Sequence, residues 1–128
     1  MTKRRAAALL PALALLLLAL MGCGGQVSPD DLVGRTYVYE KEGAGGSFTL
    51  TLAEDGTFQY YEGYLSSYVG MGVWSLEDNV LTLTEGDNGY GWVNRFAAAR
   101  RGLTFLAEGS DNFLYVKVKD GERFTPAK

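Results

Sequence analysis

The chain contains no histidine, which removes many of the side-chain arrangements that catalyse reactions in proteins. A Ser/His/Asp triad, a Cys/His pair and a zinc site with imidazole ligands all require that residue. Cys23 is the single cysteine. Carboxylates, aromatic rings and the Cys23 thiol are therefore the groups left to carry chemistry.

The acidic residues occur in short clusters that coincide with expected turns. Glu54-Asp55, Glu77-Asp78 and the pair Glu85 and Asp87 all lie where a hairpin should end, and turn carboxylates usually accept local backbone N–H groups. The stretch 85–89 offers oxygen ligands that could hold calcium, but it lacks the full loop pattern and the distal glutamate of an EF-hand. We therefore expect no enzyme, no metal and no cofactor.

The first residues have the order of an export signal. Three basic residues at 3–5 precede an Ala/Leu-rich run, Ala6 to Met21, which only Pro11 interrupts. This run is shorter than the roughly 20 residues that cross a bilayer core, and no basic stop-transfer flank follows it. A cleaved signal over residues 1–22 is expected rather than a permanent transmembrane helix.

Leu20-Met21-Gly22-Cys23 resembles the lipobox of bacterial lipoproteins, in which an apolar residue and a small residue precede the cysteine. The resemblance implies cleavage after Gly22 and transfer of diacylglycerol to the Cys23 thiol, as a stable thioether. The chain would then lie on the extracytoplasmic side of the cell membrane, anchored by lipid. An ordinary signal beside a stray cysteine is the alternative.

Cleavage would leave 106 residues, enough for one domain with a core of its own. With its cysteine acylated, the domain would have no disulfide and would depend on packing. Its 9 basic and 15 acidic residues give a formal charge of −6, so neither nucleic acid nor anionic lipid headgroups are expected partners. Residues 23–31, rich in Gly, Ser, Pro and Asp, should form a tether, and residues 32–128 a monomeric domain.

Short β-rich runs recur along that domain at intervals of roughly eight to twelve residues, separated by Gly, Asp and Asn, the spacing of an antiparallel sandwich or barrel. Alternating apolar residues give each run one buried face, and Asp55-Gly56 and 77–79 are typical hairpin turns. Because closure removes the exposed edges of a meander, we predict an all-β, eight-stranded up-and-down barrel. The expected strands are Val33 to Glu40, Ser47 to Leu52, Thr57 to Glu62, Gly70 to Leu76, Val80 to Thr84, Gly91 to Ala98, Leu103 to Ala107 and Phe113 to Lys119.

Four motifs of the first half resemble the lipocalin-like domains of small bacterial lipoproteins: Leu32-Val33-Gly34, Asp55-Gly56-Thr57-Phe58, Gly72-Val73-Trp74 and the run 79–84. The resemblance implies a compact eight-stranded barrel. Thr36 stands where that family often has tryptophan. The second half, from Asn94 to Tyr115, is similar to uncharacterised lipoproteins of Gram-positive bacteria, which implies no activity.

Aromatic residues gather around the expected fourth strand. The stretch 62–70 mixes Tyr, Ser and Gly, as binding loops do, because rigid rings add contact area and small residues let the backbone adapt. A plain alternative is that Trp74 and Trp92 fill the barrel and the tyrosines edge a turn. The candidate ligand-binding residues are Tyr60, Tyr64, Tyr68, Trp74, Trp92 and Arg95.

Arg95 is included because its place beside Val93 suggests a charge directed into or across the barrel. A buried arginine needs a carboxylate, so it would either bind an anionic ligand or pair internally with Glu62 or Glu108.

Three classes of function remain open. The first is a non-catalytic binding module for a small ligand, a glycan or an envelope protein. The second is a structural or inhibitor-type interaction protein, which a barrel filled by its own side chains would favour. The third, a carboxylate-dependent enzyme, is the least favoured.

Overall fold

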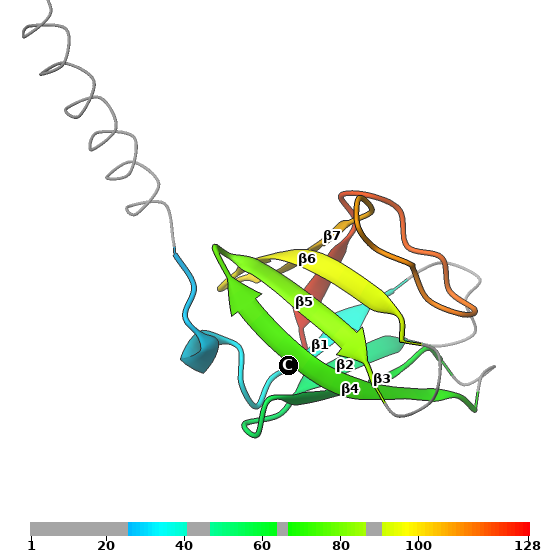
Figure 1. Ribbon diagram of the computed structural model, residues 1–128, viewed down its shortest axis with the longest axis horizontal. Coiled ribbons are helices and arrows are strands. Elements are labelled where there is room, and N and C mark those ends of the chain that lie inside the picture. Colours follow the sequence, from blue (N-terminus) through cyan, green and yellow to red (C-terminus); the bar gives the residue numbers. More distant parts are fainter. Residues whose placement is uncertain (1–25, 41–46, 64–66, 87–90) are drawn as a thin grey trace, which may run out of the picture.

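Eight antiparallel strands form a closed barrel in the computed structural model, which describes residues 26–40, 47–63, 67–86 and 91–128 (Figure 1). Each strand pairs with the next along the chain, and the last pairs with the first through Val38 and Thr125. The predicted fold class is confirmed, and no sheet edge is left unpaired. The elements are η1 (Pro29–Asp31), β1 (Thr36–Tyr39), β2 (Phe48–Leu52), β3 (Thr57–Tyr61), β4 (Val69–Glu77), β5 (Val80–Glu85), β6 (Val93–Ala99), β7 (Gly102–Leu106) and β8 (Arg123–Pro126).

The connections make the two ends of the barrel unlike. Tight turns at residues 53–56, 78–79 and 100–101 join strand pairs at one end, which we call the turn end. The connections at the other end, which we call the loop end, include the long segment 107–122 (Figure 1). Asp78 and Asn79 both have positive φ, 52° and 61°, so this two-residue turn matches the type that suits the twist of a hairpin.

The N-terminal segment lies against the turn end. The Val27 N–H donates to Asn79 Oδ1 at 2.8 Å, and the Val27 side chain is buried. Leu32, after η1, is fully buried and belongs to the core cluster. Residues 27–31, which the sequence assigns to the tether, are therefore packed on the barrel.

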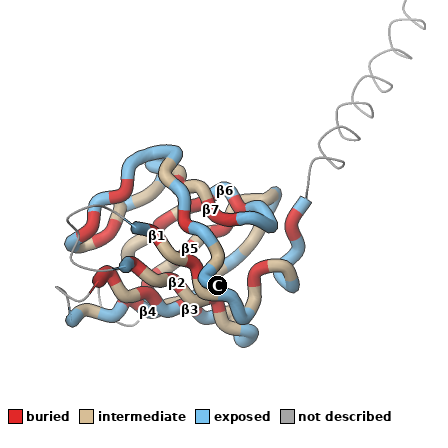
Figure 2. The backbone as a smooth tube through the Cα atoms, turned by 180° about the vertical axis from the view of Figure 1, so that it is seen from behind, coloured by how far each residue is buried: buried red, intermediate tan, exposed pale blue. Residues whose placement is uncertain are grey.

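Alternation fills the interior, as Figure 2 shows by the exchange of buried and less buried positions along the strands. The inward residues of β2 are Phe48, Leu50 and Leu52, all within 1 % of complete burial. β5 and β7 repeat this pattern with the predicted leucine and phenylalanine positions.

The predicted eighth strand, Phe113 to Lys119, is wrong: β8 is Arg123–Pro126. The backbone N–H groups of Phe113 and Val118 donate to Asn112 Oδ1, at 2.9 and 3.0 Å, rather than to a neighbouring strand. Phe113, Val116 and Val118 are buried nonetheless, so the alternation that suggested a strand reflects a loop packed over the loop end.

Candidate functional site

Tyr60 and Glu85 meet at the loop end, where β4 separates their strands. Tyr60 on β3 is paired with Gly70 on β4, and its ring lies so close that a Cβ on Gly70 would be 2.0 Å from Tyr60 Cε2. The hydroxyl donates to Glu85 Oε1 on β5. The absence of a side chain at Gly70 thus lets Tyr60 reach across a whole strand.

Glu85 also accepts a second phenol. Tyr68 donates from its hydroxyl to Glu85 Oε2 at 2.8 Å, and the Tyr60 and Tyr68 ring centroids are 6.3 Å apart. Burial, followed by the hydrogen bond to Glu85 and the charge of Glu85, raises the pKa of Tyr60 far above its usual value. The raised pKa favours the protonated phenol, in which Tyr60 donates to Glu85.

Glu62 is a second buried carboxylate at this end, 1 % exposed. Its Oε1 accepts the backbone N–H groups of Tyr115 and Val116, both at 2.8 Å, while Oε2 has no hydrogen-bond partner among the described residues. These bonds hold the segment 107–122 onto the barrel. The arrangement is that of a structural clasp, because the charge-assisted bonds satisfy loop N–H groups that no strand pairs.

Asn112 fixes the same segment with a positive φ of 73°. Its N–H donates to Asn94 Oδ1 at 2.8 Å, and its Nδ2 donates to the Val118 carbonyl at 2.9 Å. Phe113 then enters the barrel, where its ring contacts Phe48 edge-on with centroids 4.7 Å apart. The loop end is thereby closed by an aromatic side chain.

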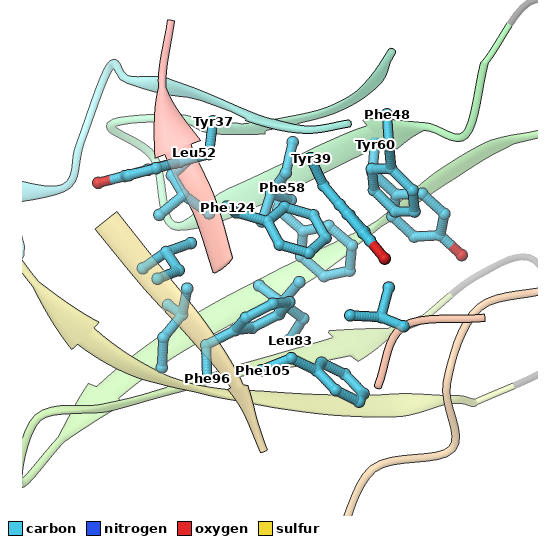
Figure 3. Close-up of a cluster of buried hydrophobic side chains, with 14 of the residues drawn as sticks. Tyr37, Tyr39, Phe48, Leu52, Phe58, Tyr60, Leu83, Phe96, Phe105 and Phe124 are labelled. Carbon is cyan, nitrogen blue, oxygen red and sulfur yellow. The ribbon is translucent and has the colours of Figure 1, made fainter. Parts of the chain in front are cut away.

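Aromatic rings occupy the interior between the strands (Figure 3). Phe48 stacks on Tyr60 at 5.5 Å, and Phe96 meets Phe105 and Phe124 edge-on at 5.5 and 5.1 Å. Distances of this size are direct ring contacts. The described interior is thus filled by the protein's own side chains.

The candidate ligand residues that the structure describes are distributed over both ends of the barrel. Tyr60 is buried in the core and Tyr68 is half-buried beside it, both bound to Glu85. Trp74 is half-buried toward the turn end, where its Nε1 donates to the Ala53 carbonyl at 3.1 Å. Trp92 is half-buried just before β6, and Tyr64 lies outside the described residues.

Arg95 does not point into the barrel. Its neighbours Asn94 and Phe96 are the buried residues of β6, so Arg95 faces outward. Its guanidinium lies against Gly109, where an added Cβ would be 3.1 Å from Nη1. Among the described residues no ion pair joins it to Glu62 or Glu108, and the expected internal pair is wrong.

An exposed apolar row on β4 is the surface feature that the sequence prediction missed. Val69, Met71 and Val73 point outward with exposed fractions of 37, 57 and 58 %. They line one side of a groove of about 540 Å³, whose other side includes Thr51 and Gln59. The signal was present in the order Val-Gly-Met-Gly-Val, in which glycines take the inward positions and apolar residues the outward ones.

The chain matches no protein-family model, no curated protein and no solved structure. Within the described ranges, no helix is long and apolar enough to cross a membrane. Across the same residues, no three acidic or cysteine side chains are grouped as a metal site would require. The calcium candidate at 85–89 falls partly outside the described residues, and Glu85 itself is bound by two tyrosines.

Proposed function

We propose that this chain is an envelope lipoprotein, anchored through diacylglyceryl-Cys23, whose barrel is a non-catalytic module that binds an envelope protein at its outer surface. The observation that carries the binding mode is the ring-filled interior, from Phe48 through Phe96 to Phe113. Rings in mutual contact within the described part of the barrel favour recognition at the exterior over a ligand held inside.

The anchor is supported by three features in order: the basic residues 3–5, the apolar run Ala6 to Met21, and Leu20-Met21-Gly22-Cys23. Val27, the first buried residue in the described part of the chain, comes only four positions after Cys23. Acylation at Cys23 would therefore place lipid beside the fold without interrupting it.

The apolar row of β4 is the proposed contact surface for the partner protein. Three adjacent outward positions that are apolar and largely exposed are unusual on a domain with a formal charge of −6, where solvated polar residues would be expected. Thr51 and Gln59 supply a polar border to the groove. An apolar centre with a polar edge is the usual composition of a protein interface.

Replacing Cys23 by Ser tests the anchor. The variant should remain at precursor size and lose membrane association, because serine offers no thiol for the diacylglyceryl transfer. Cell fractionation and mass measurement of the wild-type and variant proteins give the answer. Mature-size variant protein that still sediments with membranes would refute the anchor.

Substitution of Met71 by Lys tests the binding surface. The wild-type barrel is used to capture its partner protein from envelope extract. A charge in the centre of the apolar row should abolish this capture and leave the melting temperature of the barrel unchanged. Thr125→Lys, an exposed outward position on β8, is the matched control and should keep the recovery. Equal recovery by both variants would exclude the β4 row as the contact.

A further inference from the structure

Four arginines form one connected group at the turn end, and nothing in the net charge indicates it. Arg35 donates from Nη1 to the Arg100 carbonyl at 3.2 Å, and Arg123 donates from Nη2 to the Arg101 carbonyl at 3.5 Å. Arg100 and Arg101 are the two residues of the β6–β7 turn. All four are exposed, and we refer to them as the arginine patch.

Most of this positive charge is not neutralised by the protein. Arg100 Nε lies 3.8 Å from Asp31 Oδ2, and among the described residues this is the single ion pair of the patch. The guanidinium groups of Arg35, Arg101 and Arg123 have no carboxylate within ion-pair distance in the described part of the chain. Arg35 and Arg123 each donate to a backbone carbonyl, which orients the guanidinium and leaves other N–H donors for a ligand.

Acidic residues also lie at the turn end. Asp30 and Asp31 belong to η1, which meets the patch through Asp31, while Glu54 and Asp55 belong to the β2–β3 turn and Glu77 and Asp78 to the β4–β5 hairpin. The arginines come from the β6–β7 turn, from β8 and from the residue before β1, which are successive neighbours around the closed barrel. The four arginines are therefore neighbours on the barrel, although the whole domain is acidic.

The N-terminal segment brings this end to the membrane. Val27 is held by Asn79 and Asp31 by Arg100, and three residues separate Cys23 from Val27. Even fully extended, the link from Cys23 to Val27 spans about 14 Å at most. By contrast, the loop end lies a strand length away, about 26 Å along β4 from Glu77 to Val69.

We infer that the arginine patch docks on the phosphate groups of anionic phospholipid at the surface of the anchoring membrane. This inference rests on the proposed anchor at Cys23. A planar guanidinium pairs two of its N–H groups with a phosphate, and an anchor that holds the patch near the bilayer raises its local concentration there. The barrel then stands with its turn end on the membrane and its loop end away from it.

The test uses residues 23–128, which include every described contact of the barrel, coupled through the Cys23 thiol to maleimide lipid in vesicles. Vesicles of phosphatidylcholine alone are compared with vesicles that also contain phosphatidylglycerol. Phenylglyoxal modifies exposed arginines, and mass spectrometry gives the rate at each one. Arg95, on the outer face away from the patch, is the internal reference.

On phosphatidylglycerol vesicles, Arg101 and Arg123 should react about tenfold more slowly than on phosphatidylcholine, with Arg95 unchanged and with the difference lost in high salt. Arg101→Gln combined with Arg123→Gln should remove the protection of Arg35 and Arg100. Arg95→Gln with Lys119→Gln, the same loss of charge outside the patch, should keep it. Equal rates on both vesicles, or equal protection of Arg95, would overturn the inference.

Coupling through maleimide lipid does not require acyl transfer in the cell. Arginine protection on the vesicles, together with a failure of cells to process Cys23 in the fractionation experiment, would thus refute the anchor alone. Normal processing without arginine protection would refute the docking alone.

Discussion

The close approach of Tyr60 to Gly70 provides the sharpest prediction for the fold. A Cβ on Gly70 would lie 2.0 Å from Tyr60 Cε2 and 2.1 Å from Cζ, distances that require one group to move. The ring cannot retreat freely, because it is 1 % exposed and its hydroxyl is bound to Glu85. Gly70→Ala must therefore distort the backbone of β4 or displace Tyr60.

Either response is costly. Overpacking a core costs about 1 to 3 kcal/mol, and leaving the Glu85 carboxylate without its phenol partner costs about 1 to 3 kcal/mol more. We expect Gly70→Ala to lower the free energy of unfolding by about 3 kcal/mol. In a domain of this size that loss corresponds to about 10 to 20 °C in melting temperature.

Gly86 is the matched control, since a Cβ there would meet nothing within 4 Å. Gly86→Ala should change stability by less than about 0.5 kcal/mol. The third measurement places Gly70→Ala in a Tyr60→Ala background, where the ring that causes the clash is gone. There the substitution should be nearly neutral, which gives a coupling energy close to the whole effect of the single change. Urea unfolding of Gly70→Ala, Gly86→Ala, Tyr60→Ala and the double variant at 60 and 70 tests this prediction. Equal losses of unfolding free energy for Gly70→Ala and Gly86→Ala would refute it. The same loss from Gly70→Ala in the absence of the Tyr60 ring would also refute it.

Two further predictions concern rings at opposite ends of the barrel. Trp74→Ala should lower the free energy of unfolding by about 2 kcal/mol, because Trp74 is half-buried. Phe96→Ala, which removes a fully buried ring, should lower it by roughly 3 to 5 kcal/mol. Equal losses for the two variants in urea unfolding would contradict this prediction. Burial, followed by the hydrogen bond to Glu122 and the charge of Glu122, raises the pKa of Tyr39 from 10.0 to about 12. The unfolded chain therefore loses the Tyr39 proton at a lower pH than the folded protein does. The free energy of unfolding should then fall as the pH rises from 10 toward 12. Tyr39→Phe should make that fall shallower, and an unchanged slope would contradict the assignment.

The sequence predicts the barrel well because two strong local signals agree. Period-two alternation identifies the inward faces of β2, β5 and β7, and the turn residues Asp55-Gly56 and Asp78-Asn79 mark where hairpins reverse. Closure follows once eight short strands succeed one another. These features depend on neighbours in the chain, which a sequence displays directly.

The eighth strand was misplaced because several backbone N–H groups of residues 113–118 bond to side chains instead of to a neighbouring strand. Residues 113–118 alternate in hydrophobicity as a strand does, but Glu62 and Asn112 side chains take up their N–H groups. Glu62 is 53 positions from Tyr115. No pattern of apolar residues reveals that a distant carboxylate has replaced a neighbouring strand.

For the candidate site, the sequence indicated some of the residues that lie together but not the contacts between them. Tyr60 and Tyr68 do lie together, yet their hydroxyl groups converge on Glu85, which the sequence placed among solvated turn residues. On β4 the usual interpretation of alternation fails. Glycines occupy inward positions, where Gly70 gives room to the Tyr60 ring, while Met71 and Val73 face solvent. The identity of the inward face depends on the partner strand's side chains, which are known only once the register is known.

The proposed anchor and the ring-packed interior together would restrict where a partner can bind. Phe113 closes the loop end, and Glu62 clasps the loop that carries it, so entry from that end would require the clasp to open. The turn end is occupied by residues 27–31 and, in the proposed orientation, by lipid headgroups. The flank remains, and on it Val73 lies about 13 Å along β4 from Glu77, where the strand reaches the turn end. In the proposed orientation the apolar row of β4 would stand above the membrane and face sideways, as contact with another envelope protein would require.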